Sequence, residues 1–171
     1  MTRALAFLAA LVVAALVHFA AVTLVPGFPQ GVDVFLLVTV LEARRGQPVA
    51  GMLAGLAAGG VADALSGGIY GFQGFADTAV GFLIARAAQQ LVIQRTSSLA
   101  FIFATGAAAQ QAILAGLALV LARTGELPAP EWMFAKVATT ALLGIAWTTG
   151  VERLAGRWLS WRKTRKRGLT T

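Results

Sequence analysis

Four side chains that can hold a charge or pass on a proton lie in or beside long apolar stretches of this sequence. They are His18, Asp33, Asp63 and Asp77. An ionisable group in such a stretch indicates a functional or pairing site, because an unpaired charge is costly in an apolar medium. The chemistry open to the set is hydrogen bonding, ion binding or proton transfer.

The same set argues against an enzyme. One histidine cannot build a multi-histidine metal site, and the absence of cysteine excludes thiolate chemistry and cysteine-held metals. The sequence has no nucleophile elbow, no phosphate-binding loop and no zinc-protease motif, and no two acids have a spacing that suggests acid–base work. We therefore expect no catalytic residue, no metal and no cofactor.

Asp63 belongs to a series of glycines spaced four residues apart. The series reads Gly51, Gly55, Gly59, Asp63, Gly67 and Gly71. Residues at this spacing stay near one face of a helix, and glycine there lets a second helix approach closely. We predict that this face packs against another helix or a partner. Asp63 then lies at the lipid headgroup level, or points inward and accepts hydrogen bonds from a neighbouring segment or from unwound backbone at residues 66–71.

The other candidates lie on different segments. Asp33 opens an apolar run and is expected to cap a helix N-terminus. Asp77 lies inside a later run, where a structural hydrogen bond and a role in ion or proton transport both stay open; its candidate partners are His18, Gln73, Thr78, Gln110 and Gln111. His18 is expected to bond to a neighbouring helix. It ends a second stripe of small residues, a candidate contact face made of Ala6, Ala10 and Ala14.

The elements that position these residues are membrane helices. The 171 residues are 58% hydrophobic and 12% charged, which is far from the balance of a soluble domain. Hydropathy and turn residues predict an all-α, polytopic bundle of about six segments, at residues 4–25, 32–43, 49–65, 70–87, 98–122 and 132–151. The second segment is too short for a full span, so the second and third segments can be full or half spans.

Basic residues set the expected orientation. One side of the predicted bundle holds Arg3, Arg44, Arg45, Arg86 and Arg95, together with the basic C-terminal end. The loops on the other side contribute only Arg123, with Lys136 just inside the last segment. By the positive-inside rule, both termini are cytoplasmic and the chain is a multi-pass protein of the cytoplasmic (inner) membrane.

The C-terminal end explains much of the formal charge of +7. We divide the chain into a transmembrane domain, residues 1–156, and a basic cytoplasmic tail, residues 157–171. Trp158 and Trp161 are interleaved with the charges, a composition typical of anchoring to anionic lipid headgroups rather than to nucleic acid. The anchor residues are Arg157, Arg162, Lys163, Arg165, Lys166 and Arg167.

The central third of the sequence resembles the MreD family of bacterial rod-shape-determining membrane proteins. A G-x-x-x-D-x-x-S-G pattern is followed by a G-x-x-(G/A) turn, and both come after an Asp33-led apolar run that ends in arginine and glycine. The pattern positions are Gly59, Asp63, Ser66, Gly67, Gly71 and Gly74. The likeness extends over residues 33–86 and reaches the two ends by hydropathy alone.

This resemblance implies a non-enzymatic component of the cell-elongation machinery. Proteins similar to this one bind MreC, a periplasmic scaffold, and connect it to MreB filaments and to the peptidoglycan synthase formed by RodA and a class B penicillin-binding protein. The chain would then help to position or activate cell-wall synthesis. The family pattern does not identify which residues contact MreC.

A second reading is the substrate-binding subunit of an energy-coupling-factor vitamin transporter. Those subunits resemble this chain in size, in their six spans and in an alanine stripe on the first span, and the MreD family is expected to share their fold. Such a subunit needs polar and aromatic residues around an outward pocket, where this sequence offers only Tyr70, Phe72, Phe75 and Trp132. A channel or proton carrier that uses Asp63 and Asp77 is a third reading.

Overall fold

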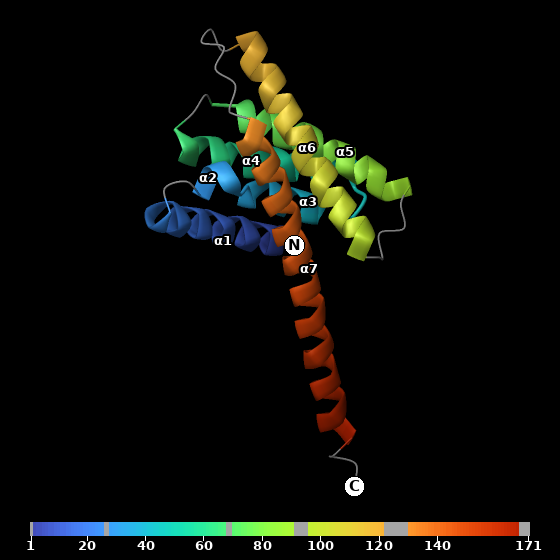
Figure 1. Cartoon of the computed structure of the whole chain (residues 1–171). Coiled ribbons are helices and arrows are strands. Elements are labelled where there is room, and N and C mark those ends of the chain that lie inside the picture. Colours follow the sequence, from blue (N-terminus) through green and yellow to red (C-terminus); the bar gives the residue numbers. More distant parts are fainter. Residues whose placement is uncertain (1, 26–27, 68–69, 91–95, 122–129, 168–171) are drawn as a thin grey trace.

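The computed structural model describes residues 2–25, 28–67, 70–90, 96–121 and 130–167, and every regular element in these ranges is a helix (Figure 1). The helices are α1 (Thr2–Leu24), α2 (Phe28–Gly31), α3 (Val34–Ala43), α4 (Pro48–Ser66), α5 (Phe72–Gln90), α6 (Thr96–Leu121) and α7 (Pro130–Arg167). Each of the six predicted segments corresponds to one helix, and α2 is an additional single turn. The predicted all-α bundle is confirmed.

Within the described ranges, three helices are long and apolar enough to cross a membrane. They span Arg3–Leu24, Pro48–Ser66 and Ser98–Leu121. The chain is therefore a membrane protein. The apolar helix α3 is shorter: its 10 residues extend about 15 Å, half of a hydrocarbon core of about 30 Å.

Helix α3 lies inside the bundle, in contact with α1, α4, α5, α6 and α7. Leu36 and Val40 on α3 are fully buried and belong to one apolar core with Val80 of α5 and Phe103 of α6. A half-length helix that is surrounded by other helices does not need to match the thickness of the bilayer, because protein rather than lipid covers its ends. The second predicted segment could be a full or a half span, and a half-length helix enclosed by protein is observed. The third segment, α4, has 19 residues, enough for about 28 Å of helix.

Helices α4 and α5 form the closest pair in the bundle. A Cβ atom added at Gly51 would lie 2.5 Å from the carbonyl oxygen of Gly81, and one added at Gly59 would lie 2.7 Å from Cα of Gly74. Gly55 faces the backbone of Asp77 at similarly close range. Three glycines at a spacing of four therefore let two backbones touch, which is how helices associate where lipid removes the hydrophobic driving force.

Helix α1 lies at the edge of the bundle. Leu11 and Ala14 are buried against the core that contains Phe35, while Ala6 and Ala10 are exposed. The face of α1 that packs inside the bundle is therefore offset from the alanine stripe, which contributes only Ala14 to it.

Helix α7 is 38 residues long, about 57 Å, and its C-terminal half extends away from the other helices (Figure 1). The helix passes without a break through the predicted division between residues 156 and 157. For residues 151–167 the structure describes the helical backbone alone, so the side chains of the predicted anchor lie outside the described part. Those side chains are Arg157, Arg162, Lys163, Arg165, Lys166 and Arg167.

Candidate functional site

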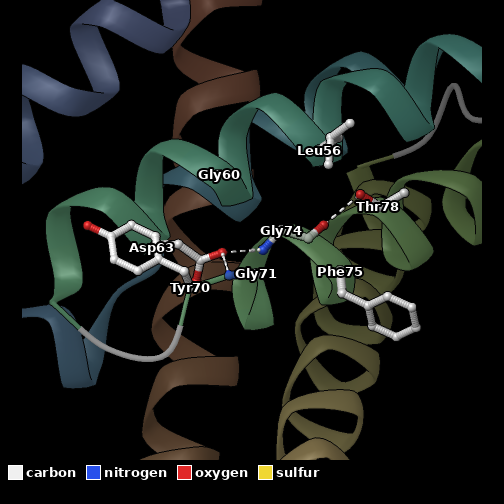
Figure 2. A pocket seen from close by; sticks show the side chains of 8 residues that line it. All are labelled: Leu56, Gly60, Asp63, Tyr70, Gly71, Gly74, Phe75 and Thr78. Carbon is white, nitrogen blue, oxygen red and sulfur yellow. Dashed lines mark hydrogen bonds between the residues drawn. The ribbon is translucent and has the colours of Figure 1, made fainter.

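Asp63 joins the end of α4 to the start of α5. Its Oδ2 accepts hydrogen bonds from the backbone N–H groups of Gly71, at 3.0 Å, and Gly74, at 2.9 Å (Figure 2). Its Oδ1 accepts one from the N–H group of Gln73 at 3.0 Å. The side chain is 3% exposed. These donors are the free N–H groups at a helix N-terminus, where a carboxylate is favoured by hydrogen bonding and by the helix dipole. The inward-pointing reading of Asp63 is therefore the observed one.

The glycine series changes its role after Asp63. Gly67 and Gly71 have φ angles of +63° and +94°, a left-handed conformation that glycine adopts without strain, and a Cβ added to either residue would meet nothing within 4 Å. Gly67 ends α4 as its C-cap, and Gly71 precedes α5. The first three glycines of the series therefore make a packing face, and the last two make a turn.

A cavity of about 390 Å³ opens beside Asp63, between α4 and α5 (Figure 2). Its rim carries exposed apolar side chains, among them Tyr70 at 75% and Phe75 at 60% exposure. The lining residues are Leu56, Gly60, Asp63, Tyr70, Gly71, Gly74, Phe75 and Thr78. Because the Asp63 oxygens are taken up by backbone donors, this groove is mainly an apolar surface suited to a hydrophobic partner.

A second polar site lies in the interior of the bundle, around Asp33. Oδ1 of Asp33 accepts hydrogen bonds from the N–H groups of Phe35, at 3.1 Å, and Leu36, at 2.9 Å, so the predicted N-cap is confirmed. Its Oδ2 lies 3.4 Å from Nζ of Lys136 on α7. Asp33 is 4% exposed, and the Lys136 side chain is 14% exposed, so this is a buried ion pair.

Gln110 of α6 connects this ion pair to Asp77 of α5. Its Nε2 donates to Oδ2 of Asp33 at 2.9 Å and to Oδ1 of Asp77 at 2.7 Å. Asp77 and Gln110 have no exposed surface, and Oδ2 of Asp77 has no hydrogen-bond partner among the described residues. Gln110 was one of five partners considered for Asp77, and it is the one that makes the contact.

Helix α7 makes further bonds to the same region. The hydroxyl of Thr140 accepts a hydrogen bond from the Asp33 N–H at 3.3 Å, and the hydroxyl of Thr139 donates to the carbonyl of Gly31. The contact of α7 with Asp33 was not predicted. The available signal was Lys136 itself, a lysine inside an apolar segment, which indicates a buried acid as its partner.

His18 of α1 packs against two aromatic rings. Its ring centroid is 5.3 Å from that of Phe35 and 6.5 Å from that of Phe28. Among the described residues the imidazole makes no hydrogen bond, so the expected bond to a neighbouring helix is not observed there. No group of three or more histidine, aspartate or glutamate side chains in the described part of the chain converges on a possible metal position.

The sequence was compared with curated proteins, solved structures and protein families. No curated protein and no solved structure is similar enough to be matched. The model of a protein family described as "rod shape-determining protein MreD" matches residues 1–148, which include helices α1 to α6, the first half of α7 and Asp63. The chain therefore belongs to the MreD family of rod-shape-determining membrane proteins.

Proposed function

We propose that this protein is a non-enzymatic integral component of the bacterial cell-elongation machinery, which binds MreC and helps to position or activate peptidoglycan synthesis. The observation that carries the proposal is the family match over residues 1–148. MreB, RodA and a class B penicillin-binding protein are its further proposed partners. We also propose that it resides in the inner membrane with both termini in the cytoplasm, and that the basic end of α7 contacts anionic lipid.

The surfaces of the bundle are compatible with a scaffold. The groove beside Asp63 presents Tyr70 and Phe75 on an apolar rim, and on α1 the exposed Ala6 and Ala10 form a flat face. Aromatic side chains in a groove and small residues on a helix are two features that favour contact with another membrane helix. Both faces are candidates for binding MreC.

The proposal is tested by purifying the tagged chain from its native membrane in mild detergent and identifying the proteins that accompany it. We expect MreC, with or without the elongation synthase. Recovery of a paired ATPase and its transmembrane coupling subunit instead would contradict the proposal and identify a vitamin transporter.

Two variants locate the binding face in the same experiment. Gly60→Leu fills the groove, because Gly60 lines it and a Cβ there meets nothing within 4 Å. Ala10→Leu adds bulk to the exposed face of α1. Both positions are on the surface, so both variants should insert and fold, and loss of MreC with one of them assigns the interface. Gly116→Leu, at an open position on α6, is the control.

A further inference from the structure

The three aspartates of the chain are all buried, and they differ in how their charge is compensated. Asp63 accepts three hydrogen bonds from backbone N–H groups at a helix start. Asp33 accepts two from the first turn of α3 and is paired with Lys136. Asp77 has one hydrogen bond, from a neutral amide, and its Oδ2 has no partner among the described residues.

The described groups around Asp77 leave no donor for that oxygen. Nε2 of Gln110 has two hydrogens, and it uses one for Asp33 and one for Asp77. Lys136 lies against Asp33. Two buried carboxylates therefore share one lysine and one amide, which leaves one negative charge without compensation in an apolar core that includes Val80, three residues further along α5. A buried carboxylate in that situation takes up a cation or a proton, because an isolated charge is far more costly there than a neutral carboxyl group.

We propose that Oδ2 of Asp77 is a proton-binding site, so that the Asp33–Gln110–Asp77–Lys136 cluster holds one proton in addition to its ion pair. Oδ1 already accepts the Gln110 hydrogen bond, so the proton is bound at Oδ2. With it, the cluster is electrically neutral: one carboxylate, one ammonium group and one carboxylic acid. This assignment is independent of whether the protein binds MreC.

The ligand is a proton rather than a metal ion, because the described residues around Asp77 do not offer the oxygen ligands that a metal needs. Hard cations such as Mg²⁺ or Ca²⁺ take six or more oxygens. In the described residues no three histidine, aspartate or glutamate side chains come together. Gln110 turns its amide hydrogens, not its oxygen, toward both carboxylates. The charged groups that act electrostatically on Asp77 from the packed elements are Asp33, Lys136 of α7 and Asp63 of α4.

The test uses the fact that the chain has only three aspartates. The protein is produced with ¹³C in the aspartate carboxyl group, reconstituted in lipid vesicles at pH 7, and studied by infrared spectroscopy. We expect one protonated carboxyl group, seen as a C=O stretch that shifts with the ¹³C label, beside two ionised carboxylates. Three ionised aspartates would overturn the proposal, whether Oδ2 then binds water or an alkali ion.

Two variants assign the band. Asp77→Asn should remove the labelled C=O band, whereas Asp63→Asn should keep it, because Asp63 lies outside the cluster and its carboxylate accepts three hydrogen bonds from backbone N–H groups. A band that is kept with Asp77→Asn, or lost with Asp63→Asn, would place the proton outside the cluster and contradict the proposal. If Asp77→Asn does not fold, the wild-type count of one protonated aspartate in three still decides whether the proton is bound.

Discussion

The carboxylate of Asp63 lies 2.9 Å from the backbone nitrogen of Gly74, and this contact joins the end of α4 to the first turn of α5. Asp63 also accepts hydrogen bonds from the N–H groups of Gly71 and Gln73, so this single side chain fixes the connection between the two most closely packed helices. The glycines of α4 make the close approach possible, and the acid fixes where it begins.

Asp63→Asn should therefore destabilise the protein by about 1–3 kcal/mol, because the new NH₂ group faces backbone donors and leaves buried N–H groups unsatisfied. Thermal unfolding in detergent, followed by tryptophan fluorescence, measures the change. Ser66→Ala is the control: its hydroxyl makes one long bond, 3.3 Å, to the Asp63 carbonyl, and its loss should cost at most about 1 kcal/mol. Equal stability of the two variants would show that the carboxylate does not hold the turn.

The packing of α4 on α5 predicts opposite effects for the same substitution on two faces of α4. Gly55→Ala places a methyl group against the backbone of Asp77 and Thr78, which should cost about 1–3 kcal/mol through overpacking. Gly60→Ala meets nothing within 4 Å and should be neutral or stabilising, by up to about 1 kcal/mol, because alanine favours helix. The same unfolding measurement compares them, and a Gly55→Ala protein as stable as Gly60→Ala would contradict the close contact.

Much of this fold could be predicted from local sequence signals. Pro48 at the start of α4 and Gly67 at its end are standard helix boundaries, and Asp33 caps α3 as its position before an apolar run indicates. Hydropathy located all six segments, because a helix in lipid must be apolar along most of its length.

The polar contacts between distant segments could not be predicted in the same way. Gln110 and Asp77 are 33 residues apart, and Lys136 and Asp33 are 103 residues apart, so their meeting depends on how the helices are arranged. Hydropathy fixes which segments are helices and says little about their neighbours. Small-residue stripes were equally ambiguous: the glycines of α4 pack inside the bundle, whereas Ala6 and Ala10 of α1 do not.

The proposed orientation predicts which positions can be labelled from outside. The chain has no cysteine, so single-cysteine variants need no altered background. Tyr70→Cys, at an exposed position before α5, should react with a membrane-impermeant maleimide in intact spheroplasts. Arg45→Cys, after α3, should react only once the membrane is permeabilised. The reverse pattern would place the termini outside.

Removal of residues 159–171 should leave this labelling pattern unchanged. Arg3, Arg44, Arg45, Arg86 and Arg95 stay in place on the proposed cytoplasmic side, and they suffice for the positive-inside rule. A truncated chain in which Tyr70→Cys is protected in intact spheroplasts would show that the basic end of α7 sets the topology.

The buried ion pair between Asp33 and Lys136 predicts a larger effect than a pair on the surface. Lys136→Met leaves the Asp33 carboxylate buried without its counter-charge and should cost about 3–5 kcal/mol. The double variant with Asp33→Asn should recover part of that loss, because asparagine still caps α3 and carries no charge. Arg45→Met removes the exposed pair with Glu42 and should cost less than about 1 kcal/mol. Additive losses in the double variant would show that Asp33 and Lys136 do not interact.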